Sequence, residues 1–340
     1  MPVTTNATLG VIFKGAERFI HDYKASATVG YNTFVGVNAG NFTMSGTATD
    51  ASYNTAVGYS SMSSLTSGPG NSAFGYQALF SNTGGSLNSA FGYSSLYSNT
   101  GGTNSAFGAH ALYSNTTGYS NSAFGAAALY PNTTGSNNSA FGSNALYSST
   151  AGNRNSAFGE SALYSAAGDS NTAIGYEAGS GITTGHNNTC IGHNAQVPTG
   201  TSSNQVRIGN TSVTYAGVQV AWTITSDRRW KSNIMHSGLG LDFISRLRPV
   251  SYIRNNDDRK RTEYGFIAQD IEESLKEMGV ESTGMLTVDD AGRYELRYND
   301  LLAPMVKAIQ ELKQENNSLN NELESLKKLV QALDIKVASK

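Results

Sequence analysis

Charged side chains are nearly absent from a long stretch of this 340-residue chain. Most of the 23 Lys and Arg residues and most of the 25 Asp and Glu residues follow Ser226. Between Ala25 and Thr225 the charged residues are Asp50, Arg154, Glu160, Asp169, Glu177 and Arg207. The sequence therefore predicts two parts with different kinds of fold, one low in charge and one rich in charge, with a boundary near Ser226.

Cysteine is also scarce, because Cys190 is the single one in the chain. One cysteine excludes an intrachain disulfide framework. Cys190 occupies a position where sister repeats carry alanine, which favours a small buried residue over a reactive thiol. The five histidines never pair at ligand spacing with cysteine or acidic clusters, so we expect no metal and no cofactor.

Long apolar runs and basic patches are missing as well. No stretch of 18 or more apolar residues occurs, so we expect no membrane insertion. The net charge of -2 gives no basic footprint, which disfavours nucleic acid as a partner. The first ten residues lack the basic and apolar regions of a secretory signal.

The low-charge part is built from a short internal repeat. The pentapeptide Asn-Ser/Thr-Ala-Phe/Val/Ile-Gly returns mostly every 16 or 17 residues, and an Ala-Leu-Tyr-like segment and a Gly-containing turn follow most copies. The copies and their variants begin at Asn32, Asn54, Asn71, Asn88, Asn104, Asn121, Asn138, Asn155, Asn171 and Asn188. Because this period is too short for a helical hairpin, each unit is interpreted as two short strands and two turns.

Stacking these units gives a parallel β-solenoid over residues 32–210. One unit cannot bury an apolar face alone, whereas rungs stacked about 4.8 Å apart pair their backbones and align identical residues. We expect two inner ladders, one of phenylalanines from Phe74 to Phe158 and one of leucines from Leu79 to Leu163. The repeated glycine would turn a corner with positive φ or meet a neighbouring backbone. The repeated asparagine would hydrogen-bond its own copies.

Three further interpretations complete this part of the chain. Residues 1–31 form an N-terminal cap or attachment segment, and residues 211–225, where bulky residues alternate, form connecting strands. A disordered low-complexity linker is the alternative for the repeats, but the strict spacing of Phe and Leu argues against it.

The pentapeptides resemble the head repeats of trimeric bacterial adhesins and, more closely, repeats of phage tail-fibre proteins. This resemblance implies a parallel homotrimer, as either a β-roll or a triple β-helix. A rod of identical chains would also cover apolar faces that one chain leaves open.

Residues 301–340 carry a heptad pattern typical of a parallel coiled coil. Asn316 is the single polar residue of the seam and is interpreted as a register device. The alternative is a long amphipathic helix docked on its own domain. The seam consists of Met305, Ile309, Leu312, Asn316, Leu319, Leu323, Leu326, Val330, Leu333 and Val337.

Residues 226–300 indicate a small α+β domain. Ile234 to Leu247 has helical spacing and Val250 to Ile253 is strand-like. A helix is expected to begin near Tyr264, and a hairpin is expected between Leu286 and Tyr298. The overall fold class is therefore mainly β, with a solenoid rod, a small α+β domain and a C-terminal coiled coil.

Five ordered motifs in this region resemble the self-cleaving intramolecular chaperone of phage endosialidases and tail spikes. They begin with Ser226-Asp-Arg-Arg-Trp-Lys-Ser-Asn-Ile234 and Leu239-Gly-Leu-Asp-Phe-Ile. Leu247-Arg-Pro-Val-Ser-Tyr252, Tyr264-Gly-Phe-Ile-Ala-Gln-Asp270 and Tyr298-Asn-Asp-Leu-Leu-Ala-Pro304 complete the set.

The resemblance implies a Ser/Lys dyad, with Ser226 as nucleophile, Lys231 as general base and the scissile bond between Thr225 and Ser226. A serine needs a base to become nucleophilic, and a desolvated lysine can accept its proton. Asp227 is a candidate for orienting the turn or capping a helix, and Gln269 is a candidate for shaping the site.

The sequence therefore predicts a phage tail-fibre-like rod whose C-terminal chaperone aligns three chains and then cuts itself off. Expected partners are other copies of the chain and a host-cell surface glycan or protein receptor. The rod would reside in the virion, and assembly and the released chaperone would belong to the host cytoplasm. The alternative is a trimeric bacterial surface adhesin with a β-roll head and no self-cleavage.

Overall fold

The computed structural model describes residues 11–24, 28–45, 50–219, 222–281 and 283–338, with side chains to residue 334. Its contacts divide the chain into two compact units, one ending at Val213 and the other beginning at Thr214. Among the helices of the described residues, none combines the length and the apolar character of a membrane-spanning segment.

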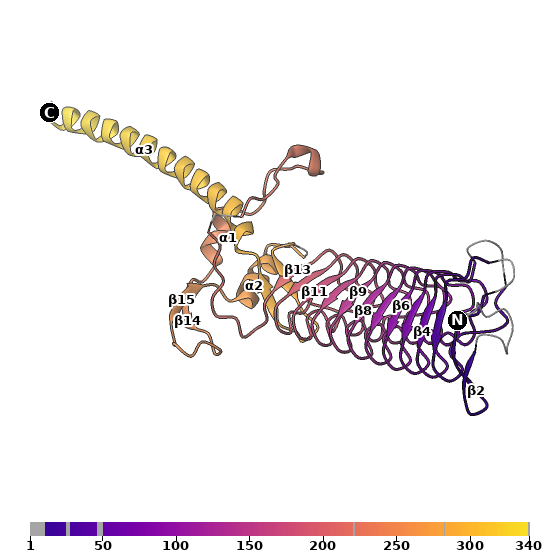
Figure 1. Ribbon diagram of the computed structural model, residues 1–340. Coiled ribbons are helices and arrows are strands. Elements are labelled where there is room, and N and C mark those ends of the chain that lie inside the picture. The colour runs from indigo at the N-terminus through magenta and orange to yellow at the C-terminus, as the bar shows by residue number, and fades with distance from the viewer. Residues whose placement is uncertain (1–10, 25–27, 46–49, 220–221, 282, 339–340) are drawn as a thin grey trace. The chain divides into compact units, whose positions relative to one another are not determined.

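The first unit is a β-solenoid whose thirteen strands lie side by side in chain order (Figure 1). Strands β1 and β2 are antiparallel, and every pairing from β3 to β13 is parallel. The strands are β1 (Ile12–Lys14), β2 (Glu17–His21), β3 (Thr33–Val35), β4 (Thr55–Val57), β5 (Ser72–Phe74), β6 (Ser89–Phe91), β7 (Ser105–Phe107), β8 (Ser122–Phe124), β9 (Ser139–Phe141), β10 (Ser156–Phe158), β11 (Thr172–Ile174), β12 (Thr189–Ile191) and β13 (Val206–Ile208).

Identical residues stack on successive rungs, as the repeat predicts. Ala106 pairs with Ala123, and Phe107 pairs with Phe124. The backbone hydrogen bonds join neighbouring rungs of one chain; for example, the Ser105 N–H donates to the Asn121 carbonyl at 2.8 Å. A single chain therefore builds the solenoid, which is the arrangement of a β-roll.

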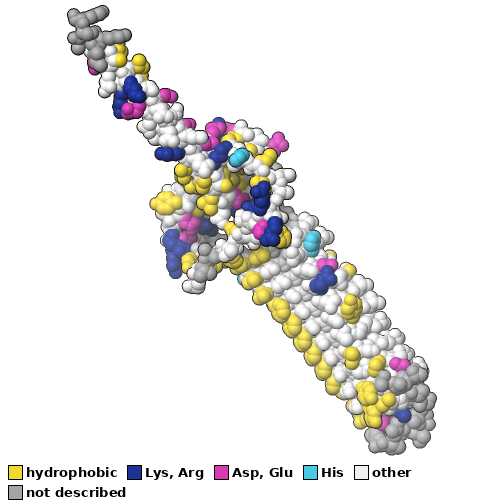
Figure 2. All heavy atoms as spheres, turned by 90° about the horizontal axis from the view of Figure 1, so that it is seen from above, with side chains coloured by type: hydrophobic (Ala, Val, Ile, Leu, Met, Phe, Trp, Pro, Cys, Tyr) yellow, Lys and Arg dark blue, Asp and Glu magenta, His cyan; other side chains and the backbone are white. Residues whose placement is uncertain are grey.

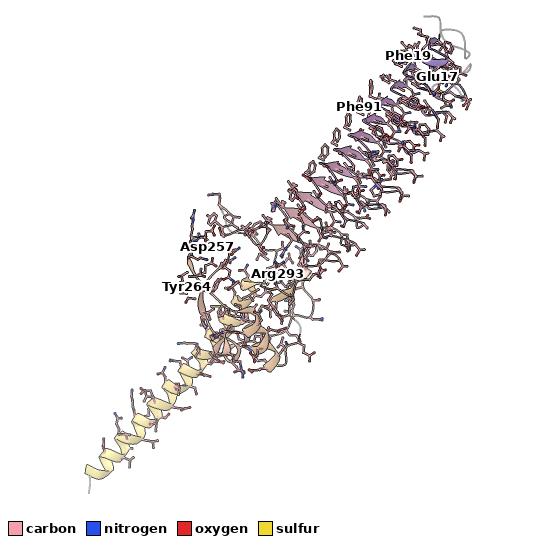
Figure 3. All side chains as sticks on the ribbon, turned by 90° about the horizontal axis from the view of Figure 1, so that it is seen from below. Glu17, Phe19, Phe91, Asp257, Tyr264 and Arg293 are labelled. Atoms are coloured by element: carbon pink, nitrogen blue, oxygen red, sulfur yellow. The ribbon has the colours of Figure 1, made fainter. Side chains whose placement is uncertain are left out.

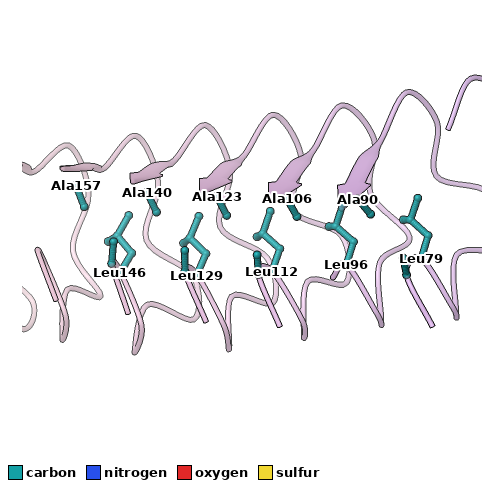
Figure 4. Close-up of a cluster of buried hydrophobic side chains, with 14 of the residues drawn as sticks. Leu79, Ala90, Leu96, Ala106, Leu112, Ala123, Leu129, Ala140, Leu146 and Ala157 are labelled. Carbon is teal, nitrogen blue, oxygen red and sulfur yellow. The ribbon is translucent and has the colours of Figure 1, made fainter. Parts of the chain in front are cut away.

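The core of the solenoid is a narrow column of alanine and leucine side chains (Figure 4). The leucine ladder from Leu79 to Leu163 is fully buried, which confirms one of the two expected inner ladders. The residue between Ser and Phe in each strand, such as Ala106 or Ala123, is also fully buried. Because the inward-facing alanines are small, the interior of each rung has room for a single leucine side chain.

The expected inner phenylalanine ladder is wrong, because these rings point outward. Side chains alternate across a strand, so a buried Ala73 places Phe74 on the opposite face. Phe74 is 37% exposed, and the ring labelled Phe91 in Figure 3 points away from the solenoid. Asn71, three residues before Phe74, lies on the inner face instead and is fully buried.

The second strand predicted in each unit is also wrong. Leu79 adopts a left-handed conformation with φ of 52°, which breaks an extended segment into a turn. Each typical rung therefore has one three-residue strand. Gly108 turns the corner with φ of 140°, and a Cβ there would lie 2.5 Å from the Gly125 carbonyl oxygen. Both expected reasons for the repeated glycine hold at this position.

The repeated asparagines form a hydrogen-bonded ladder inside the solenoid. Asn121 is fully buried, and its N–H donates to the Asn104 Oδ1 at 3.0 Å. Its side-chain amide donates to the Gly135 carbonyl at 2.8 Å. The ladder satisfies polar groups whose burial would otherwise be costly, as the sequence predicts.

An N-terminal hairpin of β1 and β2 covers the edge of β3. His21 pairs with Phe34 across the β2–β3 contact, and its Nε2 lies 2.7 Å from the Ala39 carbonyl oxygen. The His21 ring lies between Phe34 and Phe42, with centroid separations of 4.8 and 4.5 Å. Burial lowers the pKa of His21 to about 4, so the ring is neutral at pH 7.

The second unit is a small α+β domain with a long C-terminal helix. Its core contains Phe243, Ile271, Leu275, Met285 and Leu301. Its elements are η1 (Arg228–Trp230), α1 (Leu241–Arg246), β14 (Val250–Ile253), β15 (Thr262–Gly265), α2 (Ala268–Glu277), β16 (Leu286–Val288), β17 (Tyr294–Leu296), η2 (Tyr298–Leu301) and α3 (Leu302–Ala338).

Several predicted elements of this unit are present. β14 has its predicted bounds, and β16 and β17 form the predicted hairpin with Val288 opposite Tyr294. α1 is shorter than the predicted helix, and β15, which pairs with β14, was not predicted. The described residues of 211–225 contain no strand, so the connecting strands predicted there are not observed.

Helix α3 leaves its predicted seam uncovered. From Leu312 to Asp334 every residue is exposed, which excludes the alternative of a helix docked along its own domain. Asn316 accepts a hydrogen bond from Asn320 within the helix at 2.8 Å. Val337, the last predicted seam residue, lies outside the described side chains.

Candidate functional site

The junction between the repeats and the charged region contains a single 3₁₀ turn, η1. Asp227 caps this turn, because its Oδ1 accepts the Arg229 N–H at 2.8 Å. The turn ends at Lys231, whose N–H donates to the Arg228 carbonyl at 3.1 Å. This turn brings the side chains of Ser226, before it, and Lys231, after it, close together.

Ser226 and Lys231 meet across the turn. Lys231 Nζ donates a hydrogen bond to Ser226 Oγ at 2.7 Å. Both residues are exposed to water. A hydroxyl within hydrogen-bond reach of an amine is the arrangement that a Ser/Lys nucleophile and base require. The two residues singled out in the sequence are therefore adjacent in space.

Asp227 and Arg229 form an ion pair beside this contact. Arg229 Nη2 lies 2.7 Å from Asp227 Oδ2. The hydrogen bonds from Arg229 hold the pKa of the Asp227 carboxyl below its usual range, and the same pair raises the pKa of Arg229. Asp227 therefore holds the turn through charge-assisted hydrogen bonds.

Trp230, which directly precedes Lys231, and Gln269 take no part in the contact between Ser226 and Lys231. Trp230 is 82% exposed, so its ring does not shield Lys231 from water in the single chain. Gln269 lies exposed in the first turn of α2. Within the described part of the chain, no hydrogen bond or ion pair joins Gln269 to Ser226 or Lys231.

Two residues of α3 that the sequence did not single out anchor the segment downstream of the Ser226–Lys231 contact. Lys307 Nζ donates to the Ser237 carbonyl at 2.6 Å. Glu311 Oε2 accepts the Leu241 N–H at 2.6 Å and so caps α1. This hydrogen bond is the main cause that lowers the pKa of Glu311. Because these contacts span 70 residues, no local sequence signal could have found them.

No cluster of three or more His, Cys, Asp or Glu side chains that could hold a metal ion occurs among the described residues. Cys190 is buried in the solenoid core, and burial raises the pKa of its thiol.

The fold and this site define a β-solenoid protein with a separate C-terminal unit that begins near a Ser/Lys contact. Residues 226–280 match a peptidase family described as the chaperone of endosialidase. The solenoid and the matched segment together fit a tail-fibre protein with a C-terminal chaperone domain. Comparisons with curated proteins and with solved structures gave no match.

Proposed function

We propose that the chain is a homotrimeric, tail-fibre-like rod that cuts off its own chaperone between Thr225 and Ser226. The observation that carries self-cleavage is the 2.7 Å contact between Lys231 Nζ and Ser226 Oγ. The match of residues 226–280 to a self-cleaving chaperone family supports it.

The chemistry begins when a neutral Lys231 amine takes the proton of Ser226 Oγ. The oxygen attacks the carbonyl carbon of Thr225, the C–N bond breaks, and the Ser226 nitrogen receives the proton from the lysine. An ester now links the Thr225 carbonyl to Ser226 Oγ. One water molecule hydrolyses this ester, which leaves a carboxyl group on Thr225 and restores the serine hydroxyl.

Assembly precedes cleavage in this proposal. A lysine acts as a base when its surroundings disfavour the ammonium form, and water around an exposed amine favours that form. Lys231, Ser226 and Trp230 are all exposed in the single chain. Packing of further copies around the junction would remove this water, so only assembled chains would cut.

The C-terminal unit supplies register before the rungs associate. Successive rungs are nearly identical, so copies of the solenoid can slip by one repeat. The exposed heptad seam of α3 fixes which residues lie level, because a parallel coiled coil pairs equivalent positions. After cleavage the rod has lost its assembly tool, and it resists unfolding through a kinetic barrier.

The assembled rod would serve in the virion as a receptor-binding part of a tail fibre. The fit to a tail-fibre protein supports this location. A glycan or protein of the host-cell surface is the proposed receptor, and the released chaperone would remain in the host cytoplasm.

Intact-mass measurement of expressed variants tests the dyad. We expect the wild-type chain to give fragments that end at Thr225 and begin at Ser226. Ser226→Ala should stay whole because the nucleophile is missing. Lys231→Arg should also stay whole, because arginine keeps the charge but does not release its proton at neutral pH.

Ser318→Ala and Lys328→Ala are matched controls on exposed positions of α3 outside the seam. Both should cut like the wild type. Cleavage of the Ser226→Ala chain at the same bond would refute the proposed nucleophile.

A further inference from the structure

An unbroken apolar row runs along the outside of the solenoid. On every rung the residue before the corner glycine is Val, Phe or Ile, and Figure 2 shows hydrophobic side chains aligned along the rod. This apolar row consists of Val35, Val57, Phe74, Phe91, Phe107, Phe124, Phe141, Phe158, Ile174, Ile191 and Ile208.

The phenylalanine rings of the row stack on one another. Ring centroids lie 4.7 Å apart between Phe91 and Phe107 and 4.6 Å apart between Phe107 and Phe124. Their planes are nearly parallel, at 4° and 6°. Each ring therefore covers the faces of its neighbours and offers only its edge to the outside. A sugar that stacks on a ring face has no free face here except at the ends.

Every side chain of the row is apolar, and the members are partly exposed along its length. Residues 51–153 contain no charged side chain, and Phe74 in this range is 37% exposed. In the later rungs the exposed fraction is 46% at Ile174 and 63% at Ile208. A continuous apolar surface of this kind marks an interaction site. A neighbouring aromatic row, from Phe80 to Tyr164, differs because five of its six members are tyrosines, whose hydroxyl groups suit water.

We infer that the apolar row is the contact face between copies of this chain, packed parallel and in register. The partner must offer apolar side chains at the spacing of the rungs over the whole row, and the same row of a second copy does so. The exposed seam of α3 also fits a second copy of the chain, because a parallel coiled coil places equivalent residues of two copies at the same height. Rotation about a common axis then brings Phe124 of one chain beside Phe124 of the next.

This inference rests on the self-association in the proposed function, and site-directed cross-linking of the full chain tests it. The background variant is Cys190→Ala, which places alanine where sister rungs already have it. Phe124→Cys and, separately, Phe107→Cys are then treated with a short bis-maleimide. Tyr130→Cys, on the same rung as Phe124 but in the tyrosine row, is the matched control.

We expect covalently linked chains from Phe124→Cys and Phe107→Cys, at least tenfold more than from Tyr130→Cys. Three results would show that the apolar row is not the contact face. They are equal linking at all three positions, linking at Tyr130→Cys alone, and no linking in a sample whose native mass is a multiple of the mass of one chain. If such a sample still cuts at Thr225, the proposed function stands without the inference. A monomeric native mass would overturn the inference and the self-association together.

Discussion

Ser149 occupies on its rung the repeat position that Asn132 occupies on the rung before, and within the described part of the chain neither Asn132 Oδ1 nor Ser149 Oγ has a hydrogen-bond partner. On earlier rungs asparagine occupies this position, and Asn115 donates to Asn99 Oδ1 at 2.6 Å. Asn132 donates to Asn115 in the same way at 2.7 Å. Asn99, Asn115 and Asn132 therefore form a second ladder, distinct from the one that contains Asn121. The side chain of Ser149 is too short to continue it.

Ser149→Asn should repair the ladder and stabilise the solenoid by about 1 kcal/mol, because a buried acceptor gains its donor. Thermal unfolding of the two chains compares their stability. Ser148→Asn, which changes an exposed neighbour, is the control and should have no effect. An unfolding temperature of Ser149→Asn at or below that of the wild type would argue against a repairable gap.

The corner glycines should tolerate no side chain. Gly108→Ala places a Cβ 2.5 Å from the Gly125 carbonyl oxygen at a φ of 140°, so we expect a loss on the order of 3 kcal/mol. Gly84→Ala is the matched control, because its nearest neighbour is the Ser67 hydroxyl oxygen at 3.4 Å. Equal unfolding temperatures for the two variants would contradict the close stacking of corners.

Acid should loosen the N-terminal hairpin. The pKa of His21 falls from 6.5 to about 4 on folding, mainly through burial, with a smaller contribution in the same direction from Arg18. The Ala39 hydrogen bond and Asp22 oppose this shift. The unfolded hairpin therefore binds a proton below pH 6.5 while the folded hairpin does not, and up to ~3 kcal/mol of local stability is lost as pH falls toward 4.

Amide hydrogen exchange in β2 and β3 between pH 7 and 4, corrected for the intrinsic rate, measures this loss. His21→Gln should remove the pH dependence, whereas His236→Gln, at an exposed position, should keep it. A pH dependence that survives in His21→Gln would assign the effect to another group.

The seam of α3 should control both assembly and cleavage. Leu319 is 63% exposed in the single chain, so Leu319→Lys leaves the isolated helix intact but would place a charge inside a coiled coil. We expect assembly to weaken by at least ~2 kcal/mol per chain and cleavage to slow with it. Asn317→Lys, outside the seam, should behave like the wild type when native mass and cut fraction are compared. Normal cleavage by monomeric Leu319→Lys would separate cutting from assembly.

Much of the fold could be predicted from periodicity. The rung spacing, the leucine ladder, the asparagine ladder and the seam of α3 all follow from residues that return at fixed intervals. The outward direction of Phe74 was missed because large apolar residues are usually buried, although strand alternation places Asn71 and Ala73 on the inner face.

The remaining misses have local or long-range causes. The left-handed backbone at Leu79 has no sequence signal, because leucine is not a residue expected there. β15 was missed because Thr262 to Gly265 lacks alternating apolar residues. The sequence supplied the candidates Ser226 and Lys231, but only η1 brings their side chains within 2.7 Å.

Self-assembly and self-cleavage are tested most directly by a native mass measurement on the protein purified after expression of the full-length chain. We expect complexes of three rods that end at Thr225, with C-terminal fragments that begin at Ser226. An uncut chain that stays monomeric as the protein concentration is raised would contradict it.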